Sequence, residues 1–204
     1  MNTLSIYHHC HLNPFKIRLM TLLPDTFGSD LQSHLARYTL NEAKDYDALS
    51  YVWGKIEDRA RHLLHVNGYP VILTANLYHA LQHIRDPAEP AILWVDAICI
   101  NQNDTTERGS QVLLMRNIYS GAKQVVSWLG VPSMDVRVVT EFIAELDRED
   151  DGELNHVSIL QSVFDPKFLN KWQAILYLFS FPYWKRGWII QEVVCARKLL
   201  KCGR

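Results

Sequence analysis

Segments typical of strands alternate with segments typical of helices through the middle of this chain, and that alternation most restricts its fold. Residues 46–53 are rich in β-forming side chains and end at Gly54, and 124–129 is another apolar run, closed by Gly130. Strands and helices that alternate in this way form α/β domains with a mostly parallel sheet. We therefore predict an α/β domain whose mostly parallel central sheet is flanked by helices. The expected strands are 17–23, 46–53, 91–100, 124–129 and 199–202.

A β-hairpin is expected in addition to this sheet. Asn67-Gly68 separates two apolar runs, 62–66 and 69–73. Both central positions of a tight hairpin turn need positive φ, which Asn and Gly adopt most readily. Residues 24–45 are mixed in character and give no clear secondary structure.

Two of the expected helices have recognisable starts. Thr74 is an N-cap residue for a helix that Asp86-Pro87 ends. Asp104 and Glu107 have the spacing of a capping box, which would account for Glu107 without any functional role. The helix that they begin should run to about Gly121 and bury Val112, Met115, Ile118 and Tyr119. Further helices are expected at 136–146, 156–164, 171–181 and 185–198.

Composition restricts the class of protein. The chain has 204 residues and a formal net charge of -1, so it lacks the basic field that a general nucleic-acid binder needs. The uncharged run 172–184 is too short and too polar to span a bilayer, and the N-terminus has no signal-peptide pattern. The four cysteines form no CxxC pair, which favours reduced thiols and a cytoplasmic protein.

Three blocks of sequence together resemble the heterokaryon incompatibility (HET) domain of filamentous fungi. They are YDALSYVWG at 46–54, LWVDAICINQ at 93–102 and RGWIIQEVV at 186–194. The resemblance extends from about residue 17 to the end of the chain. It implies an N-terminal extension at 1–16 and a HET-like domain at 17–204, truncated at the C-terminus because family members usually continue further. It also implies a role in fungal non-self recognition, innate immunity and programmed cell death.

HET domains are in turn similar to Toll/interleukin-1 receptor (TIR) domains, some of which cleave NAD. The TIR pattern contains Trp-Cys-x-x-Glu at the start of a helix, and Trp188 and Glu192 have the same spacing, although position 189 is Ile. The resemblance implies a TIR-like sheet, with the hairpin as an addition. It also implies that Glu192 is the catalytic residue of an NAD glycohydrolase, with NAD as substrate and no cofactor required.

Glu192 has a chemistry that suits this implied role. Cleavage of the nicotinamide–ribose bond passes through an oxocarbenium-like transition state, which a nearby carboxylate stabilises. Glu192 lies on a mostly apolar helix face, where a lone carboxylate is either paired or functional. An ion pair with Arg186 or Arg108 is the structural alternative.

Residues near the ends of two expected strands are candidates for binding the nucleotide. Tyr51 and Trp53 end one strand beside Ser50 and Gly54, and a glycine lets a ligand approach the backbone closely. The alternative is a pair of core aromatic residues and a turn glycine. Asp96 interrupts an apolar strand and would bind ribose hydroxyls or cap a backbone turn.

Three further residues complete the predicted binding set. Asn101 follows the expected strand 91–100 and would bind substrate or close a loop. Arg108 would bind a phosphate or form a salt bridge. Trp188 would stack on a ring of the nucleotide, or would lie in the core or in an interface.

Metal and thiol chemistry have weaker support. His8, His9, Cys10 and His11 are close together but have no second ligand group at a standard spacing, so no metal site is predicted. His79 and His83 are expected on a solvated helix face. Cys99 and Cys195 are flanked by apolar residues and are expected to be core thiols.

Two functions from different classes therefore remain open. The first is an NAD glycohydrolase whose activity depends on self-association. The second is a non-catalytic module of heterokaryon incompatibility that signals by self-assembly, with an upstream recognition protein or domain as a partner. An inert truncated domain is a third alternative.

Overall fold

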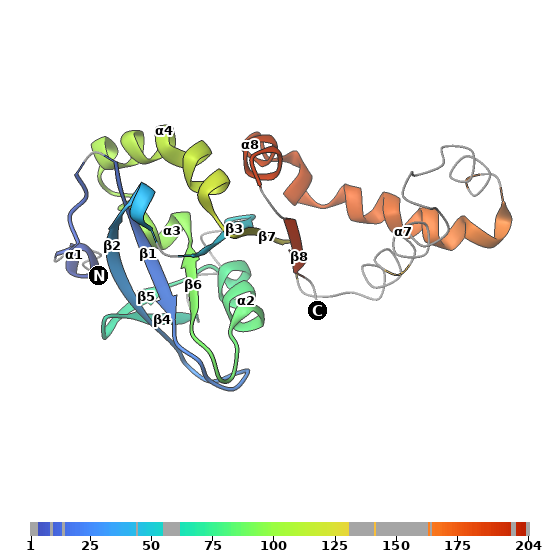
Figure 1. The fold of residues 1–204 in the computed structure, drawn as a ribbon. Helices are drawn as coiled ribbons and strands as arrows, with labels where there is room; N and C mark the ends of the chain where they lie inside the picture. The colour runs from blue at the N-terminus through green and yellow to red at the C-terminus, as the bar shows by residue number, and fades with distance from the viewer. Residues whose placement is uncertain are drawn as a thin grey trace.

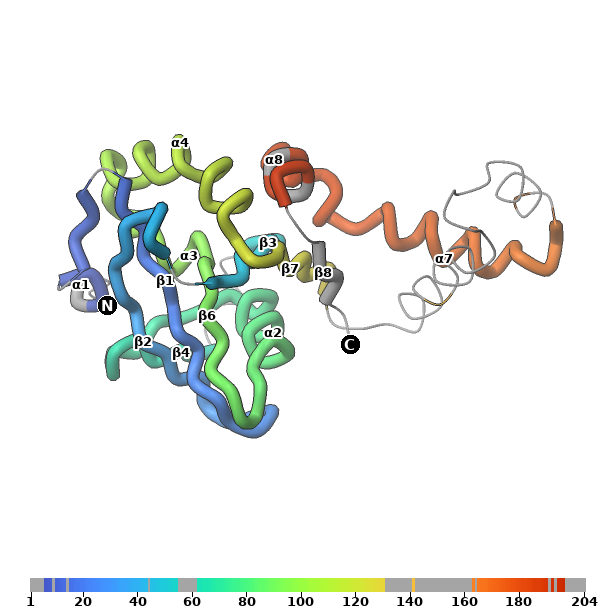
Figure 2. The backbone as a smooth tube through the Cα atoms, viewed as in Figure 1, coloured from blue at the N-terminus to red at the C-terminus, as the bar shows by residue number. Residues whose placement is uncertain are grey.

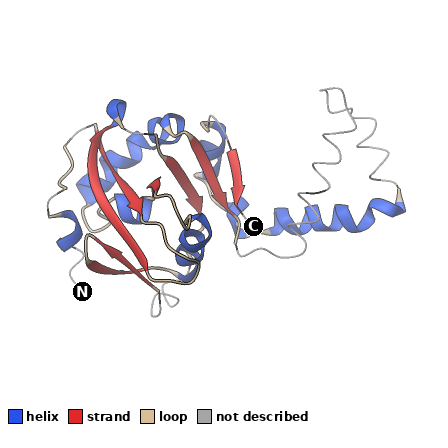
Figure 3. Cartoon of the chain, turned by 60° about the horizontal axis from the view of Figure 1, so that its bottom comes forward, coloured by secondary structure: helices blue, strands red, loops and turns tan. Residues whose placement is uncertain are grey.

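In the computed structural model, the described residues form a mixed β-sheet with helices around it (Figures 1 and 3). The structure describes residues 4–8, 10–13, 15–43, 45–54, 62–130, 141, 163, 165–196 and 199–202. Within them the sheet has eight strands in the order β5-β4-β2-β1-β6-β3-β7-β8. The strands are β1 (Lys16–Leu22), β2 (Leu31–Thr39), β3 (Asp47–Tyr51), β4 (Leu63–Val66), β5 (Tyr69–Ile72), β6 (Ala91–Trp94), β7 (Gln124–Trp128) and β8 (Leu199–Cys202).

The two halves of the sheet differ in strand direction. Strands β6, β3, β7 and β8 are parallel, as predicted. In the other half, β1 is antiparallel to both β2 and β6, and β4 is parallel to β2 but antiparallel to β5. The α/β class is confirmed, but the sheet is mixed and only partly parallel. The expectation was too simple because β2 gave no signal, and β2 is the strand that joins β1 to the hairpin.

Sequence periodicity did not predict strand β2, and it predicted the wrong end for β6. Along β2, buried and exposed residues alternate, but the buried positions include Ser33, so the alternation is not visible as apolar and polar. The expected strand 91–100 ends at Trp94, and Asp96–Cys99 form the helical turn α3. A continuous apolar run fits a buried strand and a buried helical turn equally well.

The predicted hairpin and helix starts are present. Asn67 and Gly68 have φ of 51° and 83° between β4 and β5. The Thr74 hydroxyl accepts a hydrogen bond from the Leu77 amide at the start of α2. The described helices are α1 (Leu4–Tyr7), η1 (Leu40–Glu42), α2 (Ala75–Ile84), α3 (Asp96–Cys99), α4 (Thr105–Gly121), η3 (Pro166–Phe168), α7 (Leu169–Ser180), η4 (Pro182–Lys185) and α8 (Ile189–Val194).

Helices α2 and α4 lie on opposite sides of the parallel strands (Figure 2). This follows from right-handed crossovers, because the chain moves from β3 to β6 through α2 and returns across β3 to β7 through α4. On one side Tyr119 of α4 packs edge-on against Trp94. On the other side Asn76 of α2 accepts a hydrogen bond from the Trp128 indole. Met115, Ile118 and Tyr119 are buried as predicted, whereas Val112 is only partly buried.

The C-terminal part confirms some predictions and leaves others outside the described residues. The expected helices 136–146 and 156–164 lie outside them, apart from Glu141 and Val163. Helix α8 begins at Ile189, later than expected, because Pro182–Lys185 form a separate 3₁₀ turn. The predicted strand 199–202 is confirmed as β8, and α7 projects away from the sheet (Figure 1). A search of the described residues for a helix with the length and apolarity to cross a bilayer found none.

Candidate functional site

Glu192 is buried at the C-terminal part of the chain in a two-pronged ion pair. Its side chain is 1% exposed, and its Oε1 and Oε2 lie 2.8 and 3.0 Å from the two terminal nitrogens of Arg186. Oε2 also accepts a short hydrogen bond from the Ser50 hydroxyl. Of the two arginines considered as partners, Arg186 is therefore the one that pairs with Glu192. Arg186 itself is 19% exposed.

Hydroxyl groups from two strands and a 3₁₀ turn complete this cluster. Ser50 of β3 and Ser127 of β7 are cross-strand neighbours, so both hydroxyls reach the same point. The Tyr183 hydroxyl lies 2.7 Å from Ser50 Oγ and donates to Ser127 Oγ at 2.8 Å. Burial raises the pKa of Tyr183. The cluster thus links Glu192, Ser50, Ser127 and Tyr183 through hydrogen bonds within the fold, close to the carboxyl ends of β3 and β7.

Asp96 supports Trp53 and is not directed at an open ligand position. Its Oδ2 accepts a hydrogen bond from the Trp53 indole at 2.7 Å, and its Oδ1 accepts one from the Ala97 amide at 2.7 Å. The Tyr51 hydroxyl also hydrogen-bonds to this carboxylate. Burial is the main cause of a raised pKa at Asp96. Trp53 itself is 41% exposed.

A cavity of about 170 Å³ lies next to Trp53 and apart from Glu192. It is lined by residues from β3, from β5, from the start of α2 and from the segment after α3. Tyr51, Trp53 and Asn101 are among them. Neither Glu192 nor Arg186 is among its described lining residues. Two of the predicted groups, the carboxylate and the ring-binding residues, are thus in separate places.

The remaining predicted residues belong to neither place. Gly54 has a φ of 78°, and a Cβ there would lie 3.4 Å from Thr74 Cβ, so its contact is with the start of α2. Arg108 is exposed and donates to the Gln102 carbonyl at 3.5 Å. Trp188 is 51% exposed and does not line the cavity.

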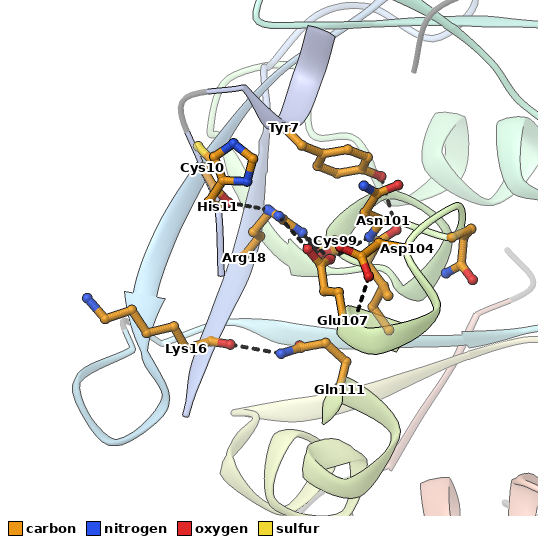
Figure 4. A network of polar contacts seen from close by, with 12 residues as sticks. Tyr7, Cys10, His11, Lys16, Arg18, Cys99, Asn101, Asp104, Glu107 and Gln111 are labelled. Carbon is orange, nitrogen blue, oxygen red and sulfur yellow. Dashed lines mark hydrogen bonds and ion pairs between the residues drawn. The ribbon is translucent and has the colours of Figure 1, made fainter. Parts of the chain in front are cut away.

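The structure contains a buried ion pair between Arg18 and Glu107 that was not predicted from the sequence (Figure 4). Arg18, in β1, has no exposed side-chain surface, and its two terminal nitrogens lie 2.6 and 2.9 Å from the Glu107 carboxylate. The Arg18 Nε donates to the Cys10 carbonyl, and Glu107 Oε1 also accepts from the Asn101 amide at 2.6 Å. An arginine inside the apolar run 17–23 was the signal that could have revealed this pair.

The capping box expected at the start of α4 is only half formed. Asp104 Oδ1 accepts from the amides of Thr106 and Glu107, as an N-cap residue does. The Asp104 amide, however, donates to the Asn101 carbonyl, and the Glu107 carboxylate is engaged with Arg18 instead. The prediction that capping explains Glu107 was therefore wrong, because a buried arginine competes more strongly for a carboxylate than a backbone amide does.

Among the described residues, the histidines and cysteines show no metal-binding arrangement. The part of the chain that the structure covers contains no group of three or more His, Cys, Asp or Glu side chains placed to hold a metal ion. His9 lies outside the described residues, and Cys10 is buried beside the Leu35 carbonyl. Cys99 is a core thiol, as expected, and burial raises its pKa to about 12. Cys195 packs against the same core.

Comparison with known proteins agrees with the sequence blocks. The family model described as heterokaryon incompatibility protein (HET) matches residues 46–192. A curated relative, heterokaryon incompatibility protein 6, OR allele, of Neurospora crassa, is 34% identical over 226 residues. That alignment covers 92% of this chain but 33% of the relative, so the chain spans about a third of the relative's length. No solved structure matches the chain, and the TIR-like fold stays a prediction. The matched region contains β3, β6, β7 and Glu192, and the chain therefore belongs to the HET family.

Proposed function

We propose that this chain acts in fungal non-self recognition that leads to programmed cell death, as a module that signals through contacts with other protein chains. Membership of the HET family and the name of the Neurospora crassa relative support the biological role. The proposed place of action is the cytoplasm, which agrees with the free thiols of Cys10, Cys99 and Cys195.

The observation that carries the non-catalytic part of this proposal is the pairing of Glu192 with Arg186. A carboxylate that stabilises an oxocarbenium ion must face the reacting carbon with its charge uncompensated. Both oxygens of Glu192 are instead bound by a guanidinium, and its side chain is 1% exposed. A buried carboxylate that is hydrogen-bonded at both oxygens fits a structural role, in which the pair fixes α8 against β3.

Exposed apolar side chains support the signalling part. Large apolar residues are normally scattered singly on the surface of a monomer, and gathered ones mark interaction sites. Here they are concentrated on α7 and around α8. Seven of the 15 exposed large apolar residues in the described part of the chain lie there, namely Leu169, Leu176, Tyr177, Phe179, Trp188, Ile190 and Val194. Self-association and binding of an upstream recognition protein or domain are the proposed uses of this surface.

NAD glycohydrolysis is the second candidate, and one observation favours it. Glu192 meets Ser50 close to the carboxyl end of β3, and ligands of open α/β sheets bind outside the carboxyl ends of the strands. For Glu192 to act on NAD, Arg186 must first leave the carboxylate. Without such an opening, the guanidinium would cancel the charge on which the reaction depends.

Nicotinamide release separates the two candidates. The purified protein is incubated with NAD at high concentration, since activity that needs self-association would be lost on dilution, and Glu192→Gln is the matched variant. Light scattering against protein concentration is recorded for both proteins. Because loss of the carboxylate should destabilise the fold, both proteins are compared at a temperature at which circular dichroism shows Glu192→Gln to be folded. The signalling proposal then expects no release above background from either protein, and the same scattering curve for both. Release by the unmodified protein that Glu192→Gln abolishes would overturn it in favour of the enzyme.

A further inference from the structure

The cavity beside Trp53 has apolar walls and the size of one ring system. Aromatic and aliphatic side chains form its walls, among them Tyr51, Trp53, Leu73, Leu77 and Ile98. Its volume of about 170 Å³ is about six times the share of one molecule in liquid water. Drug-sized ligands occupy pockets of roughly 300 Å³ or more, so this cavity holds a single planar group rather than a whole dinucleotide.

The rim of the cavity carries three successive amide side chains. Asn101, Gln102 and Asn103 all line it. Gln102 Nε2 donates to the Asp96 carbonyl and Asn101 Oδ1 accepts from the Asn103 backbone amide, but a side-chain amide has two donor hydrogens and an oxygen with two lone pairs, so both groups keep further hydrogen-bonding capacity. No charged side chain occurs among the described residues that line it. Asn and Gln side chains recognise a ligand edge that has a donor next to an acceptor, as they do with the edge of adenine.

The two sides of the rim are held in place by hydrogen bonds. The Trp53 indole is fixed by its hydrogen bond to Asp96. On the other side, the backbone amide of Asn101 donates to Glu107, which Arg18 fixes in turn (Figure 4). Positioning by hydrogen-bonded partners of this kind is what a binding site needs for precision.

We propose that this cavity binds one neutral heteroaromatic ring with an amide-like edge, such as a nucleobase, stacked on Trp53 and hydrogen-bonded by the amides of residues 101–103. Stacking of a base on an aromatic side chain supplies affinity, and the amides supply selectivity. The ring would reach the site as a free nucleoside or as one end of a larger nucleotide. This inference goes beyond the proposed function and is independent of it, because no residue of the Glu192 cluster takes part.

The test is calorimetric titration of the purified chain with adenosine, nicotinamide and NAD, with benzoate as a charged ring of similar size. Adenosine and nicotinamide each present a neutral ring, and NAD presents the adenine ring as one end of a dinucleotide, so the three separate a free ring from a dinucleotide. We expect saturable binding of at least one of them and none of benzoate. Lack of binding of all three at millimolar concentration, or equal binding of benzoate, overturns the proposal.

Matched tryptophan variants locate the binding. Trp53→Ala should weaken it at least tenfold, whereas Trp188→Ala should leave it unchanged, because both residues are about half exposed but only Trp53 lines the cavity. Asn101→Leu is a second cavity variant that keeps the aromatic wall, and it too should weaken binding at least tenfold. Circular dichroism confirms that each variant is folded. Wild-type affinity in folded Trp53→Ala or Asn101→Leu contradicts the assignment, as does an equal loss in Trp188→Ala.

Discussion

At Glu192, burial and a bound guanidinium decide what a single side chain can do. The residue was singled out because a carboxylate on an apolar helix face is either paired or functional. The sequence could not separate the two outcomes, because Arg186 and Ser50 meet Glu192 only after β3 and α8 have packed together. The apolar helix face around Glu192 indicated a buried group, and Glu192 is buried, but the pattern said nothing about its partners.

Removing one member of this pair should destabilise the protein, and removing both should not. Arg186→Met leaves a buried carboxylate without its cation, at a cost of about 3 kcal/mol in the free energy of unfolding. Arg186→Met/Glu192→Leu should recover most of that loss, because apolar residues of similar volume replace both charges. Urea denaturation measures the free energy of unfolding of the wild type, Arg186→Met and the double variant. Lys185→Met, at an exposed neighbour, is the control and should change little, and a double variant no more stable than Arg186→Met would contradict the structural role.

Cys99 should be inert to thiol reagents in the folded protein. Burial raises its pKa to about 12, so almost no thiolate is present at neutral pH, and its side chain is inaccessible. Mass spectrometry after iodoacetamide treatment should find Cys99 unmodified until denaturant is added. The half-buried Cys195 is the internal comparison and should react first. Modification of Cys99 at the same rate as Cys195 would show that the core opens readily.

The stability of the wild type relative to Asp96→Asn should be greater at acidic pH than at neutral pH. Because the pKa of Asp96 is raised, mainly by burial, the folded protein holds this proton more tightly than the unfolded chain does. Its stabilising effect is therefore present at low pH and is lost as pH rises from the ordinary carboxyl value, about 3.9, through the raised one. Asn at this position does not titrate. From about pH 7 down to about pH 4, the free energy of unfolding of the wild type should increase relative to Asp96→Asn, and the reverse trend would be inconsistent with this pKa shift.

The start of α4 shows how one helix end serves two purposes. Asp104 caps the helix, while Glu107 joins it to β1 through Arg18. Asp104→Ala should cost about 1 kcal/mol, the usual value of an N-cap. Glu107→Ala should cost about 3 kcal/mol or more, because Arg18 is left buried and unpaired. Thermal or urea unfolding of the two variants compares them directly, and equal costs would refute the importance that we assign to the Arg18–Glu107 pair.

Elements with local signals could be predicted, and elements defined by distant partners could not. The Asn67-Gly68 turn and the Thr74 and Asp104 caps act within four residues, and all three are present. Strand β2 has no such signal, because the residues that bury it come from β1 and β4. The run 91–100 was ambiguous by itself, and the turn that α3 forms became evident only in the folded chain.

In the whole molecule, the candidate site divides into a closed polar cluster and an open cavity. The sequence indicated residues of both, since Glu192, Trp53 and Asn101 follow or face the ends of expected strands. It could not show that they are separate, nor that Tyr183 and Ser127 join the cluster, because those contacts link β3, β7 and η4. The mixed sheet partly explains why the cavity is separate from the Glu192 cluster. Its antiparallel half adds the hairpin that supplies one wall of the cavity.

On the function proposed above, the Arg186–Glu192 pair supports the fold of a signalling module and performs no chemistry. The most direct test is hyphal death on expression of Arg186→Met/Glu192→Leu, after denaturation has shown that it folds with near wild-type stability. Because apolar residues of similar volume replace both charges, killing should equal that of the unmodified chain within about twofold. A folded double variant that no longer kills would contradict the account and would return Glu192 to a catalytic role.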